Sequence, residues 1–290
     1  MANISQRHHY IPEFFLKGFT NSNGFLWVFD KVKNDILKTP QSPRSIFFEK
    51  KLNTISIGLE ETDILEKAYS KLESVIAKKV ILVREHPIID EIEDIENFSF
   101  VIVFLTQLFW RIPSTDKYKT SLLNFYKFSK KSWEAIEKQK DIDFLSEDDK
   151  CKLIKSFIPY EILAEIESKY KKENKIFFKI IHFNPPAFLI SDNPIVFKKI
   201  PYTKDDFTSA LIFPISQNRL FIVLESEKYS VNNDHIKLIN LILMHQAERY
   251  FACYDRNLLE KFVDGFKPFS KIDKNDLVNV SVDLINSMNK

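Results

Sequence analysis

The sequence predicts an α+β fold in which N-terminal and C-terminal β segments form a mixed or antiparallel sheet around a large helical insert. Runs of aromatic and β-branched residues, bounded by turn residues, occur before residue 60 and after residue 174. Between them, apolar residues recur at spacings of three and four, which is typical of helices. Strands and helices do not alternate, so a parallel α/β sheet is not expected. We therefore expect one domain over residues 1–290, with the helical insert at 60–171 and a β-rich part at 174–290.

The N-terminal part is expected to begin with a short helix and a hairpin. Pro12 at a first helical turn and Gly18 after an apolar run predict a helix over 12–19 that ends on a glycine cap. Apolar runs at 25–29 and 36–38 flank the turn-like sequence Lys33-Asn34-Asp35, which is typical of a hairpin.

The middle of the chain is expected to be helical. Apolar spacing predicts a helix over 60–80, and the nearly continuous apolar stretch 98–112 predicts a central helix buried on most sides. That helix should end before Pro113, because proline cannot continue it. Further helices are expected at 118–138, 146–157 and 160–171.

The C-terminal part is expected to be rich in strands. They are predicted at 176–181, 187–190, 195–197, 210–213 and 220–224. Residues 216–219 should form a hairpin turn, and a second central helix at 232–250 should lead into a strand at 251–254. The alternation of apolar and polar residues at 277–285 predicts an edge strand.

Composition and charge exclude several classes of protein. The chain has 4 glycines and no two lie close together, so a phosphate-binding P-loop and a Rossmann glycine turn are excluded. Its 2 cysteines cannot form a disulfide framework or a thiolate zinc site. The net charge of +2 gives no global attraction for nucleic acid, although a local patch could still bind nucleic acid or a nucleotide. Since we find no signal segment and no apolar run long enough for a bilayer, we expect a cytoplasmic protein without membrane contact.

A set of short motifs is spread over most of the chain. They are Arg7-x-His9-Tyr10-Ile11-Pro12, Gln107-x-x-x-Arg111-x-Pro113, Ser191-Asp192-Asn193-Pro194 and Ala247-x-Arg249, together with Glu66, Glu73 and Asn240. The set resembles a bacterial family of proteins of unknown function that begins with a His-Tyr-x-Pro-x-x-Tyr-Leu-x-x-Phe pattern and carries a Ser/Thr-Asp-Asn-Pro motif. Phe15 stands where that family has tyrosine. The resemblance implies which residues to follow, and it implies no activity.

Asp192 and His9 are the candidates for proton transfer. Asp192 lies in an apolar stretch, and a carboxylate there can bind a metal ion, orient a histidine or accept a proton. Alternatively, Asp192 or Asn193 forms an Asx turn before Pro194. His9 can act as a general base if it meets Asp192, or it can cap or pack against the first helix. We predict that the His9 segment packs against this turn, and we take His9, Asp192, Asn193 and Arg111 as the candidate catalytic residues.

Arg111 and Gln107 lie four residues apart on one face of an apolar helix. A buried arginine needs an acidic partner or an anionic ligand, so Arg111 either clamps a ligand or joins a structural network with a carboxylate. The carboxylates available to it, which are also the candidate ligands for a divalent metal ion, are Glu66, Glu73 and Asp192. Gln107 and Asn240 are candidate substrate contacts, and Asn240 is first of all expected to be a buried hydrogen-bonding residue.

These residues leave two hypotheses for function. One is an intracellular hydrolase, a phosphodiesterase or nuclease of bacterial defence or toxin type, with arginine for phosphate charge, carboxylates for a divalent metal ion and histidine for proton transfer. The other is a non-enzymatic binding or regulatory module in which the same residues form a buried network. Side chains that converge on an open cleft favour the hydrolase, and side chains that are paired away from solvent favour the module.

Overall fold

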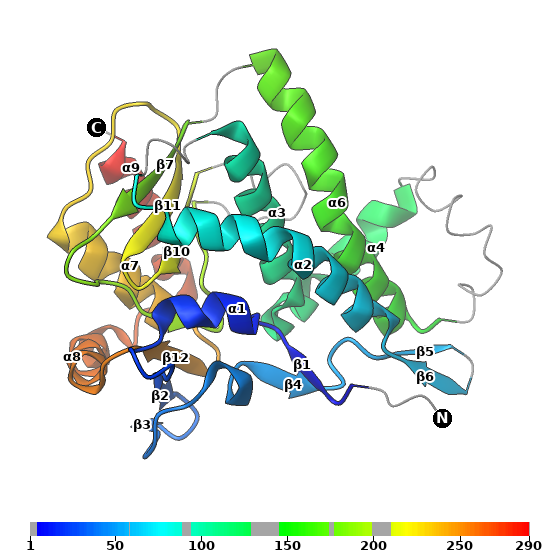
Figure 1. Ribbon diagram of the computed structural model, residues 1–290, viewed down its shortest axis with the longest axis horizontal. Coiled ribbons are helices and arrows are strands. Elements are labelled where there is room, and N and C mark those ends of the chain that lie inside the picture. The colour runs from blue at the N-terminus through cyan, green and yellow to red at the C-terminus, as the bar shows by residue number, and fades with distance from the viewer. Residues whose placement is uncertain are drawn as a thin grey trace.

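The computed structural model describes residues 5–57, 59–88, 94–128, 145–173, 177–198 and 210–289. The helical part consists of α2 (Ile64–Glu85), α3 (Ile95–Arg111), α4 (Lys119–Phe128) and α6 (Glu147–Glu173). These helices occupy the centre and right of Figure 1, and the strands that follow residue 176 lie to the left with the C-terminal helices. The predicted α+β fold with a helical insert is confirmed.

Helix α3 is the centre of the helical part. The side chain of Asp94 caps it by accepting a hydrogen bond from Asn97 N at 2.8 Å. The helix ends before Pro113, as predicted, and it packs against α2 and α6. Among the described residues, no single helix is long and apolar enough to cross a membrane; residues 96–111 and 113–124 reach that length only as a pair bent by 82°.

The predicted break between residues 157 and 160 is wrong, because α6 continues through Pro159. A proline inside a helix removes one hydrogen bond and costs about 3 kcal/mol. The buried residues on either side of it are Ile154, Ile158 and Ile162. Burial of this face, where α6 packs against α3, offsets the loss. The helix predicted at 118–138 corresponds to α4 after a 3-10 helix at Pro113–Tyr118, and its residues from 129 onward lie outside the described residues.

The central sheet joins the two ends of the chain. Its antiparallel order is β3-β2-β12-β8, formed by β3 (Asp35–Ile36), β2 (Trp27–Asp30), β12 (Tyr250–Cys253) and β8 (Ile190–Ser191). The β2–β3 pair is the predicted hairpin, and Asn34 adopts the left-handed conformation (φ 51°) in its turn. Because Phe251 lies opposite Ser191, the sheet places the loop before β12 beside the turn after β8.

A second antiparallel sheet is built from C-terminal strands. Its order is β7 (Phe177–His182), β11 (Arg219–Leu224), β10 (Leu211–Ser216) and β9 (Val196–Phe197). The turn predicted at 216–219 joins β10 to β11. Smaller antiparallel pairs are β1 (Arg7–His9) with β4 (Phe48–Lys50), and β5 (Ile55–Ile57) with β6 (Glu60–Thr62). The sequence did not predict them, because strands of three residues carry no periodic signal.

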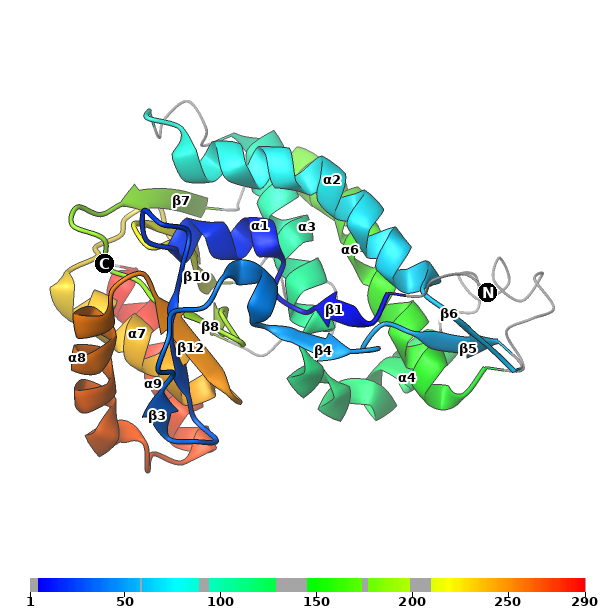
Figure 2. The same ribbon diagram turned by 60° about the horizontal axis from the view of Figure 1, so that its bottom comes forward.

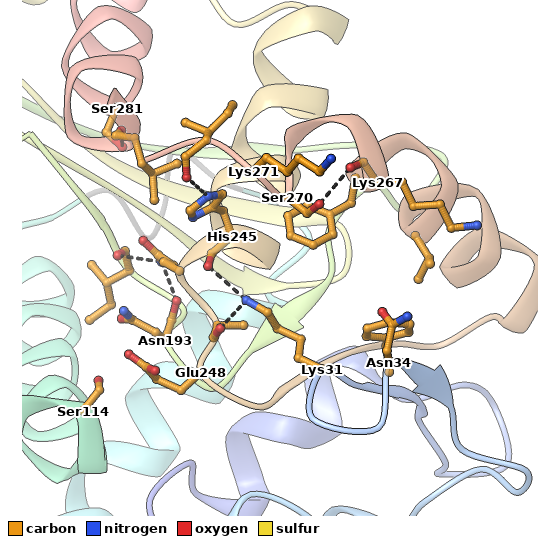
Figure 3. A pocket seen from close by; sticks show the side chains of 18 of the residues that line it. Lys31, Asn34, Ser114, Asn193, His245, Glu248, Lys267, Ser270, Lys271 and Ser281 are labelled. Atoms are coloured by element: carbon orange, nitrogen blue, oxygen red, sulfur yellow. Dashed lines mark hydrogen bonds between the residues drawn. The ribbon is translucent and has the colours of Figure 1, made fainter. Parts of the chain in front are cut away.

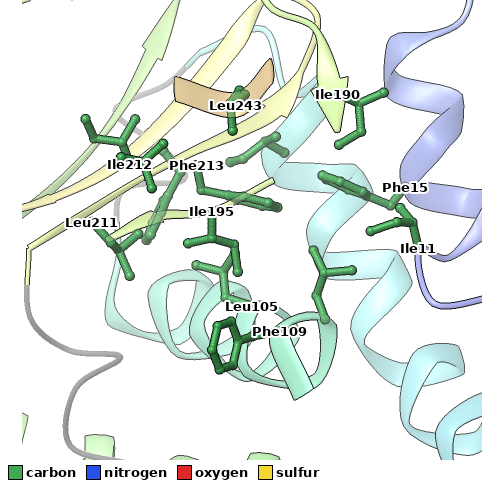
Figure 4. Close-up of a cluster of buried hydrophobic side chains, with 14 of the residues drawn as sticks. Ile11, Phe15, Leu105, Phe109, Ile190, Ile195, Leu211, Ile212, Phe213 and Leu243 are labelled. Atoms are coloured by element: carbon green, nitrogen blue, oxygen red, sulfur yellow. The ribbon is translucent and has the colours of Figure 1, made fainter. Parts of the chain in front are cut away.

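The N-terminal helix ties the parts of the chain into one core. Helix α1 (Glu13–Leu16) continues as a 3-10 helix at Lys17–Phe19. The Phe15 ring stacks on Phe213 of β10 with 5.2 Å between centroids, and it lies 5.1 Å from Phe104 of α3 (Figure 4). Gly18 is not the predicted helix cap. A Cβ at Gly18 would lie 2.8 Å from Arg84 Cδ, so the glycine allows the Arg84 side chain to pack closely against the backbone at this position.

The C-terminal helices depart most from the prediction. Helix α7 (Asn233–Gln246) ends before Ala247, so Arg249 lies in the loop before β12 and not on a helix. Helix α8 (Arg256–Phe266) was not predicted, although Asp255 caps it by accepting from Leu258 N at 2.7 Å.

Helix α9 (Lys274–Met288) replaces the edge strand predicted at 277–285. That short window alternates between apolar and polar residues, which fits a strand. The buried residues of the longer segment are Ser281, Leu284, Ile285 and Met288. Their spacing of three and four is the helical period, and it becomes visible only when Met288 is included.

Candidate functional site

Arg111 is the centre of a buried network between α2 and α3. Its side chain is 2% exposed, and its guanidinium donates to Glu73 and to the backbone carbonyl of His9. Glu66 lies 3.8 Å from the guanidinium, and the Tyr69 ring centroid lies 4.7 Å from it. The prediction that Arg111 is buried and paired with a carboxylate is confirmed.

Neighbouring amide side chains complete this network. Gln107 Nε2 lies 3.4 Å from Glu73 Oε1, and Asn53 Nδ2 donates to Glu66 Oε2 at 2.8 Å. Gln107 Oε1 is buried with no hydrogen-bond partner among the described residues. Burial raises the pKa of Glu73, and Arg111 opposes this rise. The network therefore joins β1, the segment after β4, α2 and α3, although Arg111 Nε and His9 Nε2 are also buried without a hydrogen-bond partner among the described residues.

His9 belongs to the Arg111 network rather than to the Asp192 turn. Its Nδ1 lies 3.9 Å from Glu13 Oε1, and its ring packs against Phe48 at 5.6 Å between centroids. Burial lowers the pKa of His9, which favours the neutral imidazole. In the described part of the chain, no hydrogen bond or ion pair joins His9 to Asp192; within the His9 segment, Tyr10 lines a pocket together with Asp192.

The candidate metal ligands do not form one site. Glu66 and Glu73 approach Arg111, whereas Asp192 bonds to the loop before β12. Among the described residues, no group of three or more His, Cys, Asp or Glu side chains is placed to hold a metal ion. The structure therefore does not bring Glu66, Glu73 and Asp192 together at one site among the described residues. Arg111 already bonds Glu73 and lies beside Glu66, and its positive charge opposes a second cation there.

Asp192 fixes the loop that precedes β12. Asp192 is 4% exposed, and its carboxylate accepts backbone N–H bonds from Glu248 (2.9 Å), Arg249 (2.6 Å) and Tyr250 (2.8 Å). Burial raises the pKa of Asp192, and the three N–H groups oppose this rise. Because both carboxylate oxygens are engaged, Asp192 acts by holding the loop in place.

Asn240 and Asn193 also have structural partners. Asn240 is 1% exposed; its Oδ1 accepts from Leu189 N at 3.1 Å and its Nδ2 donates to Ala187 O at 2.8 Å. Asn240 therefore joins α7 to the segment before β8 through both ends of its amide. The backbone carbonyl of Asn193 accepts from Ser191 Oγ at 2.7 Å, which stabilises the turn after β8.

Four segments singled out in the sequence meet at one pocket of about 700 Å³, which we call the Tyr10 pocket. They contribute Tyr10, residues 112–114, Asp192 and residues 248–250, and the remaining wall is formed by the continuous segment 45–50 and Lys117. The charged residues that line the pocket are Lys50, Lys117, Arg249, Glu49, Asp192 and Glu248. Cations and carboxylates are therefore balanced, and the volume is typical of a ligand site.

The family model described as "Protein of unknown function (DUF4238)" matches residues 7–256. This range contains every segment that lines the Tyr10 pocket. The chain belongs to this family. No curated protein and no solved structure matches the chain. Because the family description states no activity, the function of this DUF4238 domain has to be argued from its own geometry.

A larger pocket of about 1460 Å³ adjoins the Tyr10 pocket of the DUF4238 domain, and we call it the α8–α9 groove. The residues that line both pockets are Ser114, Lys117 and Glu248. In Figure 3, Lys31 reaches from the β2–β3 turn to the carbonyl end of α7, where its Nζ donates to His245 O at 3.1 Å. His245 Nε2 lies 2.8 Å from Ile272 O and ties α7 to the segment before α9.

Phe47 forms a wall of the Tyr10 pocket in a strained conformation. Its φ is 56°, which a bulky residue rarely adopts. Its carbonyl accepts from Tyr10 N at 3.1 Å, and its ring packs edge-to-face against Tyr10 and Tyr250 at 6.2 Å and 5.9 Å. Lys51, at the other end of β4, has a φ of 55°. Backbone strain of this kind concentrates at functional sites, and here it lies at both ends of the strand that borders the pocket.

Phe47→Gly should be about 1 kcal/mol more stable than Phe47→Ala, because only glycine adopts a positive φ without strain. Both variants lose the ring packing, so their difference reports on the backbone. Urea unfolding of the two variants measures it. The same pair of substitutions at Phe29 in β2 should favour alanine, as is usual in a strand. A Phe47→Ala variant that equals Phe47→Gly would contradict the left-handed conformation.

The sequence analysis missed most of the residues that form the Tyr10 pocket. Tyr10 and Arg249 lie within the motifs, but in these two motifs the sequence singles out only His9 as a candidate site residue. The segment 45–50 has no motif; its one signal is the aromatic pair Phe47-Phe48 directly before charged residues.

Proposed function

We propose that this DUF4238 protein is a non-enzymatic binding module that takes its ligand in the Tyr10 pocket. The observation that carries the proposal is the position of the four motif segments around this pocket. The polar groups that catalysis would need are bonded to the protein itself: Arg111 to Glu73, and Asp192 to three backbone N–H groups. Those bonds hold the walls of the pocket and leave its lining available to a ligand.

Arg249 supports a binding role because it is both positioned and accessible. Its backbone N–H is held by Asp192 at 2.6 Å, and its guanidinium stacks on the Tyr250 ring at 4.6 Å. Its side chain is 52% exposed and lies 3.6 Å from Asp30 Oδ2. A cation that is oriented in this way without being buried can contact a ligand with little loss of side-chain entropy.

The hydrolase hypothesis stays a prediction. A phosphodiesterase or nuclease of bacterial defence or toxin type, acting on nucleic acid or a nucleotide, needs a carboxylate that is free to bind a metal ion or to accept a proton. Glu66, Glu73 and Asp192 are each engaged with a protein group. The binding module accounts for those bonds directly.

The proposed function is tested with a variant that fills the pocket. Ser114 lines both pockets, so Ser114→Trp should block them, and Ser74→Trp on the exposed surface of α2 is the matched control. Saturation-transfer NMR with dipeptides, mononucleotides and inorganic phosphate should detect binding by the wild type and by Ser74→Trp, and not by Ser114→Trp. Signals that persist in Ser114→Trp, or a panel on which the wild type is silent, would count against the proposal.

The same proteins should be assayed for hydrolysis of DNA, RNA and mononucleotides with Mg²⁺, Mn²⁺ or Zn²⁺ and with a chelator. We expect no turnover by the wild type. Turnover that depends on metal and is lost in Ser114→Trp would return the function to the hydrolase hypothesis.

A further inference from the structure

We propose that the ligand of the Tyr10 pocket is an extended peptide segment of a partner protein, which adds to the open edge of β4 as a further strand. This inference rests on the proposed function, because it names the ligand class of the same pocket. It is carried by the hydrogen-bonding pattern of β4, by the course of the pocket along that strand, and by the balance of charges around it.

The β1–β4 pair leaves one edge of β4 without a neighbouring strand among the described residues. Tyr10 N donates to Phe47 O at 3.1 Å and Lys51 N donates to Gln6 O at 3.2 Å, so the hydrogen-bonded pairs fall at every second residue. The pair between them is His8 with Glu49, and the backbone groups of Phe48 and Lys50 therefore point away from β1. Among the described residues no strand pairs with this side of β4, and Figure 2 shows β1 between β4 and α2.

The Tyr10 pocket runs along this open edge. All three residues of β4, Phe48, Glu49 and Lys50, line it. Side chains of neighbouring residues in a strand point to opposite faces, so a cavity over one face would touch only every second residue. The unbroken lining by β4 therefore places the cavity at the edge of the strand, beside the N–H and C=O groups of Phe48 and Lys50, which face no other strand among the described residues. An unpaired edge of this kind is the template for strand addition.

The charges and the size of the site favour a peptide over a nucleic acid. The cations Lys50, Lys117 and Arg249 share the lining with the carboxylates Glu49 and Glu248, while the Asp192 carboxylate is bonded to the loop before β12. A polyanion would be repelled by these two glutamates, whereas a polypeptide that carries both signs can pair with the cations and with the carboxylates. The Tyr10 pocket opens beside the α8–α9 groove of about 1460 Å³, so that several residues of an extended chain find room beyond β4.

The backbone donor of the edge can be removed without loss of the β1 pairing. Lys50→Pro deletes the N–H that faces the pocket, and its preceding residue is already extended, as proline requires. Lys50→Ala is the matched control, since it deletes the side chain and keeps the N–H. Phage-displayed dodecapeptides are selected on the wild type with counter-selection on Ser114→Trp, and the affinity of one selected, labelled peptide is measured by fluorescence anisotropy.

Both variants lose the Lys50 cation and only Lys50→Pro loses the N–H, so we expect Lys50→Pro to bind the peptide about tenfold more weakly than Lys50→Ala, with similar melting temperatures for both variants and the wild type. Equal affinities of the two variants, or a selection that yields no peptide specific for the wild type, would overturn strand addition. Displacement of the peptide by oligothymidylate at lower concentrations than by unlabelled peptide would also overturn it, in favour of nucleic acid. In each of these cases the proposed function would still hold if the wild type binds dipeptides or nucleotides and Ser114→Trp does not.

Discussion

Arg111→Ala is expected to lower the free energy of unfolding by about 3–5 kcal/mol, the loss that follows when one partner of a buried ion pair is removed. The variant leaves Glu73 without its main partner and releases the His9 carbonyl, so that α2, α3 and β1 lose their common bond. Arg111→Met should lose about 1–2 kcal/mol less than Arg111→Ala, because it keeps most of the buried stem of the side chain. Urea unfolding of the purified variants measures both values.

Two further variants separate charge from packing in this network. Arg111→Met combined with Glu73→Leu should recover stability relative to Arg111→Met alone, since the Glu73 carboxylate that would lack its main partner is removed as well. Lys79→Ala is the control from the same helix pair; its partner Glu96 is 65% exposed, and such a pair contributes less than about 1 kcal/mol. Equal losses in Arg111→Ala and Arg111→Met, without recovery in the double variant, would show that the pairing is not what stabilises the helices.

The Arg111 network was predictable because its physics is local to one helix. An arginine on an apolar face that also carries Gln107 must find an acidic partner, and Glu73 provides it. The hairpin around Asn34 was predictable for the same reason, since its turn residue tolerates a positive φ. In contrast, α9 was predicted as a strand because residues 277–285 alternate as a strand does, and the helical period appears only when the segment is extended to Met288.

The Tyr10 pocket was not predictable, because its walls come from pairings between distant segments. β4 has three residues and pairs with β1 across most of the N-terminal part, and the positive φ of Phe47 has no sequence signature. The partners of Asp192 are backbone N–H groups of residues 248–250, which reveal nothing by their residue types. From the sequence, Asp192 could form an Asx turn or belong to a functional site. The pairing of β12 with β8 determines which groups its carboxylate contacts.

Asp192→Asn is expected to lower the free energy of unfolding by about 2–4 kcal/mol. From the sequence, asparagine would have kept the turn and removed only the charge. The structure changes this expectation, because both carboxylate oxygens accept backbone N–H bonds. In asparagine an NH₂ group replaces one of the two oxygens. This group is a hydrogen-bond donor and cannot accept from the backbone N–H that it faces. The loop through Arg249 should therefore loosen, and the selected peptide should bind more weakly.

Asp35→Asn is the matched control for this substitution. Asp35 also accepts a backbone bond, from Ile36 N at 2.8 Å, but it is exposed and asparagine can replace it at a cost below about 1 kcal/mol. Urea unfolding gives the stability of both variants, and amide hydrogen exchange at residues 248–250 reports on the loop itself. If Asp192→Asn unfolds like the wild type with protected amides at 248–250, Asp192 does not hold the loop. In that case, a loss of hydrolysis in Asp192→Asn would indicate a chemical role for the carboxylate. If the substitution also loosens the loop, the same loss would be explained by the changed pocket wall.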